Sequence, residues 1–197
     1  MSTYVEIKGN LIHKTAVIDW DYVEIGTGNK IGPYVCIGED AQHPRKASSG
    51  KIVIGNNNIF REHCSINRPT SWSKETKIGN SNYLMVGSHI DHDCVLEDNV
   101  RLSTQTILSG HVYIMSGAVL GLGVLIHQFQ VIGSYTMLGM GAVIPKKLSV
   151  TPGYTFAGNP AKLLKKNVIG LDRNSITEDM LKTETDRFLQ LKARYQE

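Results

Sequence analysis

The chain has 197 residues, of which 41 % are hydrophobic and 20 % are charged, as in an ordinary soluble globular protein. Its formal net charge of +3 is too small to indicate nucleic-acid binding, although a local basic patch can still meet an acidic partner. No stretch approaches the roughly 18 consecutive apolar residues of a membrane span, and the N-terminus lacks the basic-then-apolar pattern of a signal peptide.

The three cysteines, Cys36, Cys64 and Cys94, are an odd number and include no CxxC pair. Disulfide frameworks and cysteine metal sites usually show paired or even-numbered cysteines. We therefore expect free thiols and a cytoplasmic protein, because thiols stay reduced in the cytosol.

The first predicted element is a six-residue repeat that begins near the N-terminus. Ile12 and Ile18 are its first members. After one extra residue the repeat continues with three isoleucines, each directly before a glycine: Ile25, Ile31 and Ile37. Glycine suits a corner at which the backbone turns sharply.

Two polar segments interrupt this repeat, one near residues 39–51 and one near residues 67–77. Between them, Ile54, Phe60 and Ile66 keep the six-residue spacing. Both segments contain proline, so we expect them to be loops pushed out of the repeat. Loops carried by a rigid repeat protein are where specificity is usually built.

From Ile78 to Ile144, every sixth residue is Ile or Leu. A helix would carry positions six apart to different faces, and an ordinary strand has a period of two. A fixed short repeat is instead the signature of a parallel β-helix. We therefore predict an all-β solenoid over residues 1–144. It is a left-handed parallel β-helix with three hexapeptides in each triangular coil, a rare exception to the right-handed rule.

The repeat is expected to stop at Pro145, because residues 145–174 contain several turn signals and no clear period. From Ser175, the sequence Ser-Ile-Thr-Glu matches a helix capping box. An apolar stripe then predicts a helix to about Tyr195. Residues 145–197 are therefore expected to form an irregular segment and a short C-terminal α-helical cap on the last coil.

Residues about 18 positions apart should be superposed, because three hexapeptides make one coil. This superposition places five residues on one edge of the prism, none of them at an inward position: His92, Gly110, His111, His127 and Gln128. A lone prism edge is convex. A pocket there therefore requires a neighbouring subunit, packed about a threefold axis.

The chemistry of this edge favours acyl transfer without a covalent enzyme intermediate. No Ser-His-Asp arrangement is evident, and the cysteines mostly fall at inward positions. His92 can act as a general base on a hydroxyl or an amine. The N–H of Gly110, one coil away, can stabilise a developing oxyanion. Asp93 can orient the imidazole, provided that the chain bends between the two residues.

Two other classes of protein remain open from the residues alone. Histidines near a subunit edge could bind zinc and activate water, as in a γ-type carbonic anhydrase. His89 and His92 are poor joint ligands, because their rings point in different directions along a strand. The third class is a non-catalytic scaffold.

Four segments resemble the UDP-N-acetylglucosamine acyltransferases of lipid A biosynthesis, within the hexapeptide-repeat acyltransferases: residues 89–94, 109–112, 126–129 and 167–171. The resemblance extends over roughly residues 10–190. It implies transfer of a fatty acyl group from acyl carrier protein to a nucleotide-linked sugar by a homotrimer. It implies no metal, and no cofactor beyond the donor thioester. A CoA-dependent sugar acetyltransferase of the same fold fits these segments less well.

The same resemblance implies roles for individual residues. His92 corresponds to the general base, Asp93 to its partner and Gly110 to the oxyanion donor. Ten further positions correspond to contacts with the sugar nucleotide or the acyl chain: Gln42, His43, Arg45, Arg68, His89, His111, His127, Gln128, Asn167 and Arg173. The basic C-terminal region would receive the acidic carrier protein.

The sequence departs from the family where the sugar or the nucleotide is bound. His43 follows Gln42 where the family has an acidic residue, and Arg45 replaces a lysine. Ile169 stands where the family has glutamate. We therefore expect the acceptor to be UDP-N-acetylglucosamine or a related amino sugar. Met140 stands where many relatives have glycine, and its bulk should shorten the acyl chain that is accepted.

Overall fold

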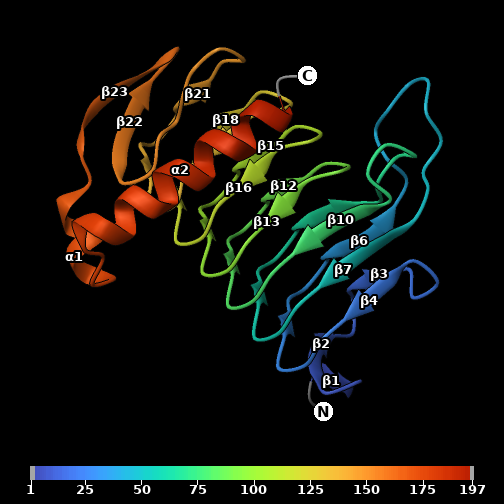
Figure 1. The fold of residues 1–197 in the computed structure, drawn as a ribbon. Helices are drawn as coiled ribbons and strands as arrows, with labels where there is room; N and C mark the ends of the chain where they lie inside the picture. Colours follow the sequence, from blue (N-terminus) through green and yellow to red (C-terminus); the bar gives the residue numbers. More distant parts are fainter. Residues whose placement is uncertain (1–2, 196–197) are drawn as a thin grey trace.

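The computed structural model describes residues 3–195 and shows a three-sided solenoid with a hairpin and two helices at its C-terminal end (Figure 1). The strands of the solenoid form three sheets, which we name A, B and C. Sheet A contains β1 (Tyr4–Ile7), β2 (Asn10–His13), β5 (Lys30–Ile31), β8 (Ile59–Phe60), β11 (Tyr83–Leu84), β14 (Arg101–Leu102), β17 (Val119–Leu120), β20 (Met137–Leu138), β22 (Tyr154–Gly158) and β23 (Ala161–Lys166).

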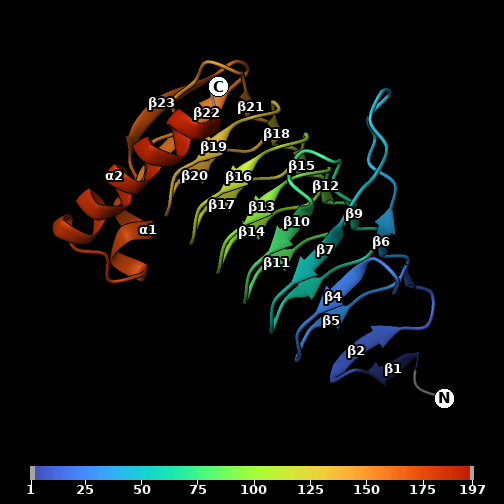
Figure 2. The ribbon, with the colours of Figure 1, turned by 45° about the vertical axis from the view of Figure 1, so that its right-hand side comes forward.

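Sheet B contains β3 (Val17–Ile18), β6 (Cys36–Glu39), β9 (Ser65–Asn67), β12 (His89–Ile90), β15 (Ile107–Leu108), β18 (Leu125–Ile126) and β21 (Val143–Ile144). Sheet C contains β4 (Val23–Ile25), β7 (Lys51–Ile54), β10 (Glu75–Ile78), β13 (Val95–Leu96), β16 (Tyr113–Ile114) and β19 (Val131–Ile132). From β2 to β21, successive strands along the chain visit the three sheets in turn, and Figure 2 shows the coils stacked side by side.

The register of the sheets follows the six-residue repeat. Leu84 pairs with Leu102, Leu102 with Leu120, and Leu120 with Leu138, all in parallel strands. These leucines are buried in one continuous core. The spacing of three hexapeptides per coil therefore sets the register, and the predicted left-handed parallel β-helix is confirmed.

The corners of the solenoid require left-handed backbone at fixed intervals. Asp93, His111 and Phe129 occupy equivalent places between sheets B and C, with φ of 59°, 62° and 62°. Few residue types adopt this conformation readily. The chain turns sharply at each of these residues, which brings the side chain of Asp93 back towards its own neighbour.

Two loops leave the solenoid at this same corner. The first, residues 40–50, connects β6 to β7, and the second, residues 68–74, connects β9 to β10. An antiparallel bridge between Ser48 and Thr70 holds them together. Figure 1 shows both loops rising beside sheet B at the N-terminal half of the solenoid.

The prediction that the repeat ends at Pro145 is wrong. Val150 bridges Ile132 in parallel, and Phe156 in β22 pairs with Leu138. Both residues continue the six-residue spacing from Ile144 and are buried. The segment expected to be irregular therefore contains part of another coil, the antiparallel hairpin β22–β23 and the helix α1 (Val168–Arg173).

The last helix, α2 (Glu178–Tyr195), differs from the expectation in its start and its position. Thr177, not Ser175, caps it, because the Thr177 hydroxyl accepts the Met180 N–H at 3.3 Å. Phe188 is buried against Met115 and Val131, so α2 lies along the outer face of sheet C instead of over the last coil. Neither helix in residues 3–195 is long and apolar enough to span a membrane.

Candidate active site

The corner between sheets B and C brings together a histidine, an aspartate and a glycine from adjacent coils. His92 and Asp93 lie in the corner that follows β12, and Gly110 lies in the corner that follows β15, the next strand of sheet B. His92 is only 5 % exposed and Asp93 only 2 %. Both side chains point out of the prism, yet the two loops cover them. A convex edge thereby becomes a sheltered site.

His92 and Asp93 form the central pair of the site. The Nδ1 of His92 lies 2.8 Å from Oδ2 of Asp93. This bond raises the pKa of His92 above the ordinary value of 6.5. Because Nδ1 donates to the carboxylate, Nε2 of the neutral ring keeps its lone pair, which is the arrangement of a general base.

Asp93 is held by the loop of residues 68–74. The hydroxyl of Thr70 donates to Oδ2 at 2.7 Å, and the hydroxyl of Ser73 donates to Oδ1 at 2.5 Å. The backbone N–H groups of the same two residues also point at the carboxylate, each at 3.2 Å. Burial by itself raises the pKa of Asp93, but the bonds from His92, Ser73 and Thr70 outweigh it and hold the pKa well below its usual range.

Gly110 lies against the face of the His92 ring. A Cβ at this position would come within 2.7 Å of Nε2 of His92, so only glycine fits. Gly110 is buried, and its N–H has no acceptor among residues 3–195. A buried N–H without a partner is rare in folded proteins. This donor lies beside the base and is free to bind an oxygen of a reacting group.

His111 lies over Asp93 and is kept neutral. Its Nε2 is 3.6 Å from Oδ2 of Asp93, and its ring stacks on Phe129 with centroids 4.3 Å apart. Burial lowers the pKa of His111 to about 4, although the charge of Asp93 acts in the opposite direction. The surroundings therefore shift the pKa values of the two histidines in opposite directions, up for His92 and down for His111.

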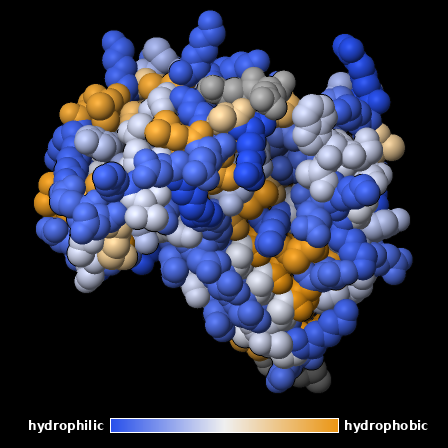
Figure 3. All heavy atoms as spheres, in the orientation of Figure 1, coloured by the Kyte–Doolittle hydropathy of each residue, from blue (hydrophilic) through white to orange (hydrophobic). Residues whose placement is uncertain are grey.

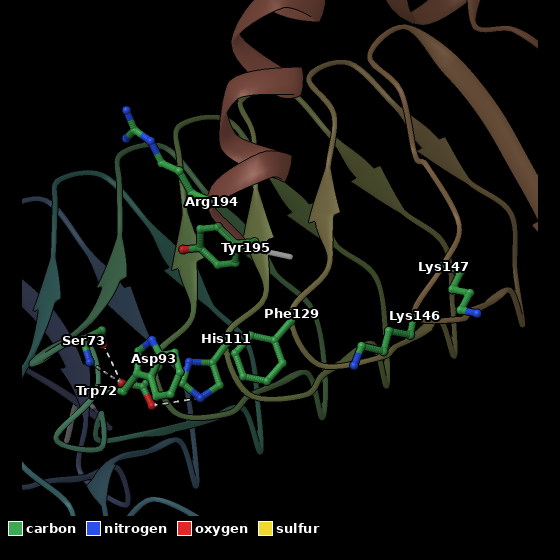
Figure 4. Close-up of a pocket in the computed structure, with 9 residues that line it drawn as sticks. All are labelled: Trp72, Ser73, Asp93, His111, Phe129, Lys146, Lys147, Arg194 and Tyr195. Atoms are coloured by element: carbon green, nitrogen blue, oxygen red, sulfur yellow. Dashed lines mark hydrogen bonds and ion pairs between the residues drawn. The ribbon is translucent and has the colours of Figure 1, made fainter. Parts of the chain in front are cut away.

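A cavity of about 820 Å³ opens next to Asp93 and His111 (Figure 4). Its remaining lining residues come from the second loop, from the corners of later coils and from the end of α2: Trp72, Ser73, Phe129, Lys146, Lys147, Arg194 and Tyr195. The volume lies within the range of small-molecule sites.

No profile of a known protein family matches the chain. It is 40 % identical over 157 residues to the acyl-[acyl-carrier-protein]–UDP-N-acetylglucosamine O-acyltransferase of Gloeothece citriformis, and 39 % identical over 160 residues to that of Synechocystis. These alignments cover 79 % and 80 % of this chain but 56 % and 57 % of those proteins. The chain thus spans little more than half the length of these curated relatives.

Two solved structures agree with these relatives. The UDP-N-acetylglucosamine acyltransferase of Bacteroides fragilis is 31 % identical, with a TM-score of 0.82 over 90 % of this chain and 69 % of that one. A structure of the same enzyme family from Acinetobacter baumannii is 32 % identical, with a TM-score of 0.68 over 91 % of this chain and 81 % of that one. The chain belongs to the UDP-N-acetylglucosamine acyltransferase family.

Several residues that the family resemblance marks as substrate contacts lie near this pair. The ring of His43 in the first loop is 5.6 Å from that of His92. His89 is half-buried on β12 itself, and its Nδ1 is 2.8 Å from the hydroxyl of Ser65 on the preceding coil. His127 and Gln128 are exposed two coils after His92, where Nδ1 of His127 bonds to the Gln128 carbonyl oxygen at 3.0 Å.

Other expected contacts are engaged elsewhere or lie apart from the pair. Arg68 forms an ion pair with Asp40, and its guanidinium lies 3.8 Å from the ring centre of Tyr22. Gln42 and Arg45 are exposed on the first loop. Within one chain, His43 is therefore the expected contact of the first loop whose ring lies against the His92 imidazole.

The two C-terminal residues assigned to the nucleotide are not near this pair within one chain. Asn167 caps α1, where its Oδ1 accepts the Gly170 N–H and its Nδ2 donates to the carbonyl oxygen of Tyr135. Arg173 is exposed at the end of α1. In Figure 1, α1 lies at the opposite end of α2 from the end that reaches the cavity.

Met140 lies on a different corner of the prism from His92. It follows β20 of sheet A, between sheets A and B, and is 74 % exposed. His92 follows β12 of sheet B. A single protein chain therefore does not place Met140 beside the general base. For Met140 to limit the length of the acyl group, a second subunit must supply it or the acyl group must cross sheet B.

The site offers little support for a metal centre. Among residues 3–195, His92, Asp93 and His111 bring their ligand atoms within 4.8 Å of one another. Two of these atoms are bonded to each other, and Asp93 also accepts hydrogen bonds from Thr70 and Ser73. Its lone pairs are thus already used.

Sequence reasoning did not find the residues that fix Asp93. Thr70 and Ser73 lie in a loop outside the repeat, where periodicity places nothing. Trp72 of the cavity lies in the same loop, and Tyr195 lies at the end of α2, so the repeat could place neither of them. Phe129 could have been found, because it is two coils after Asp93 in the same register.

Proposed function

We propose that this protein transfers a fatty acyl group from the thioester of acyl carrier protein to a nucleotide-linked sugar, in the biosynthesis of a lipid A-type lipid. The acceptor is UDP-N-acetylglucosamine or a related amino sugar. The observation that carries this proposal is the His92–Asp93 pair beside the Gly110 N–H, which has no acceptor within residues 3–195. The relatives support it through the activity in their names.

The reaction follows from these three groups. Nε2 of His92 takes the proton from the acceptor hydroxyl or amine, and the freed lone pair attacks the thioester carbonyl carbon. The carbonyl oxygen becomes an oxyanion and accepts the hydrogen bond of the Gly110 N–H. When the C–S bond breaks, the imidazolium returns the proton to the departing thiolate. Asp93 stabilises the imidazolium between these two steps.

A covalent acyl-enzyme through cysteine is disfavoured by the surroundings of the nearest thiol. Cys94 is fully buried, and its S–H donates to the carbonyl oxygen of Ser109 at 3.3 Å. Burial raises the pKa of this thiol far above its ordinary range, so no thiolate forms at neutral pH. Direct transfer between donor and acceptor is the route that remains with the groups at this corner.

Acyl carrier protein is the proposed protein partner, and the hairpin β22–β23 is a suitable place for it to dock. Lys162 and Lys165 are exposed on β23, and Leu163 and Leu164 between them are exposed as well. Figure 3 shows hydrophobic side chains on the surface around this hairpin. Lysines beside apolar side chains complement an acidic protein that also buries some apolar area.

The active form is proposed to be a homotrimer in the cytoplasm. Ile107 and Leu125 stack on the outer face of sheet B, where both are exposed, and Leu122 is exposed on the adjacent corner. Such an apolar strip is suited to packing against another copy. The three free thiols agree with a reducing compartment.

Purified protein should be incubated with a panel of acyl carrier proteins and nucleotide sugars, and the products analysed by mass spectrometry. We expect an acylated nucleotide sugar with wild type and none with His92→Ala, while both elute as trimers in light scattering. Normal turnover by His92→Ala would overturn the proposal. Acetylation from acetyl-CoA alone would favour the CoA-dependent alternative. Zinc-dependent hydration of carbon dioxide would favour the carbonic anhydrase alternative.

A further inference from the structure

A second carboxylate, that of Asp91, faces the ring nitrogen of His92 that Asp93 leaves free. Oδ2 of Asp91 is 3.9 Å from Nε2 of His92, the nitrogen that acts as the base, whereas Asp93 bonds to Nδ1. The Asp91 side chain is only 16 % exposed. The bond to Asp93 is the main cause of the raised pKa of His92, and the charge of Asp91 acts in the same direction. Asp91 therefore belongs to the immediate surroundings of the reacting atoms.

One oxygen of the Asp91 carboxylate has a structural role, and the other oxygen has none. Oδ1 accepts the backbone N–H of His92 at 2.8 Å, which fixes the direction of the side chain. Oδ2 accepts no hydrogen bond from residues 3–195, and His92 is the only basic side chain of those residues within ion-pair distance of it. A largely buried carboxylate oxygen normally has a donor. Oδ2 is therefore available to a donor on the substrate.

The spacing of these two acceptors fits a nitrogen nucleophile better than an oxygen nucleophile. At ordinary hydrogen-bond lengths of about 2.9 Å, a single atom can reach both Nε2 of His92 and Oδ2 of Asp91, which are 3.9 Å apart. A primary amine has two N–H groups and can donate to both. A hydroxyl has one O–H group, so once it donates to His92 it has no hydrogen left for Asp91. The negative charge that develops on its oxygen would also lie beside the Asp91 carboxylate, which is unfavourable.

The charges that develop during amide formation fit the same arrangement. A neutral amine attacks the thioester carbon with the lone pair that it already has, so the N–C bond forms before the proton leaves. The tetrahedral intermediate then carries a positive nitrogen with two N–H groups and a negative oxygen. The Asp91 carboxylate stabilises this nitrogen, and the Gly110 N–H stabilises the oxygen. His92 removes one proton and passes it to the departing thiolate as the C–S bond breaks, while the other hydrogen stays on the amide.

We propose that Asp91 is a specificity-determining residue that selects an amino group as the acceptor, so that this protein forms an amide. The inference rests on the proposed function and narrows its acceptor to a nucleotide-linked sugar with a free amine. Asp91 accepts one N–H of the nucleophile, and His92 takes the proton of the other. Asp93 keeps its role as the partner of Nδ1.

Two kinds of acceptor test this role: UDP-N-acetylglucosamine, and a series of its analogues in which one sugar hydroxyl at a time is replaced by an amino group. The value of kcat/KM should be measured with each, and the products analysed by mass spectrometry before and after mild alkaline hydrolysis, which cleaves an ester and spares an amide. Wild type should prefer one amino analogue about tenfold or more. Asp91→Asn keeps an acceptor for the His92 N–H but removes the charge. It should lower this preference about 10- to 100-fold, as expected for the loss of a charge-assisted hydrogen bond.

Two further variants separate selectivity from folding. Asp91→Ser introduces the residue that the next coil carries at the equivalent position, Ser109, so the coil accommodates it. It should lose the preference as Asp91→Asn does. The matched control is Asp19→Asn, because Asp19 follows β3 at the same corner three coils earlier and is exposed. This variant should keep the preference of wild type.

The results distinguish a failure of this inference from a failure of the proposed function. If wild type forms an ester from UDP-N-acetylglucosamine at least as efficiently as it forms an amide from every amino analogue, selection by Asp91 is refuted and the proposed function stands. An equal loss with both kinds of acceptor in Asp91→Asn would show that Asp91 only orients His92, and would also overturn the inference. If wild type transfers no acyl group from any acyl carrier protein to any of these acceptors, the proposed function fails, and the inference fails with it.

Discussion

Gly110 lies so close to His92 that a methyl group in place of its hydrogen would come within 2.4 Å of Cε1 of the imidazole. The two residues are one coil apart, and the N–H of Phe129 on the next coil bonds to the Gly110 carbonyl oxygen at 3.2 Å. The backbone at Gly110 is therefore fixed. A side chain at position 110 must therefore displace the His92 ring, because the backbone cannot move away from it.

This contact predicts that Gly110→Ala loses activity without losing the fold. Displacement of the general base by a few tenths of an ångström to 1 Å should lower kcat by about 100-fold. Turnover and circular dichroism should be measured together. The control is Gly123→Ala, at a corner where an added Cβ meets nothing within 4 Å but φ is +66°. That variant should lose stability and keep its kcat; equal loss of kcat in both would contradict the prediction.

The bond between His92 and Asp93 predicts the pH dependence of the reaction. A general base works when it is neutral, so kcat/KM should rise as pH increases through the pKa of His92. Because the bond to Asp93 raises that pKa above 6.5, the acid limb should lie above 6.5. Asp93→Asn should move the limb to lower pH and reduce the plateau by about 100-fold or more. A pH–rate profile with an unchanged acid limb in Asp93→Asn would argue against this pairing.

The fold was largely readable from the sequence because its register depends on a single period. Leu84, Leu102, Leu120 and Leu138 form one buried ladder, as their spacing requires. The same period placed Gly110 over His92. The end of the solenoid was misjudged because Pro145 hid the continuation through Val150 and Phe156, where the period holds but turn residues intervene.

The loops that cover the site could not be predicted from the sequence, because loops do not follow the six-residue repeat. The bend that lets Asp93 reach His92 is a left-handed residue at a corner, which sequence reasoning required but could not locate. The contacts of Thr70 and Ser73 with Asp93 depend on how residues 68–74 fold back over the corner. The position of α2 likewise depends on the packing of Phe188 against sheet C. The apolar stripe of a helix predicts a buried face, but it does not predict which surface covers that face.

We predict that Thr70 positions the Asp93 carboxylate through its hydroxyl group, and that the shape of its side chain alone is not sufficient. Thr70→Val keeps the volume but removes the donor at 2.7 Å from Asp93. The carboxylate then has one bond fewer and less restraint, so kcat should fall about tenfold. Thr70→Ser, which keeps the hydroxyl, should restore turnover. A loss of the same size in Thr70→Ser would show that packing, not the hydroxyl, is what matters.

We predict that Met140 limits the length of the acyl chain that is bound at the site of a neighbouring subunit. It lies between two and three coils beyond His92 along the prism, about 13 Å at 4.8 Å per coil, but on the corner between sheets A and B. In a trimer, this corner of one copy can face the corner between sheets B and C of its neighbour. The exposed Met140 side chain would then close the groove that begins at the neighbour's general base.

Met140→Gly should therefore shift the preferred donor to a longer acyl chain, because the groove gains depth equal to the lost side chain. Products should be compared by mass spectrometry across donors of increasing length. The matched control is Leu122→Gly, one coil before Met140 on the same corner and also exposed. Leu122 would line the side of the groove instead of its end, so Leu122→Gly should weaken donor binding without changing the preferred length. Unchanged chain-length selectivity in Met140→Gly would refute this role of Met140. A longer preferred acyl chain in both variants would place the end of the groove one coil closer to His92.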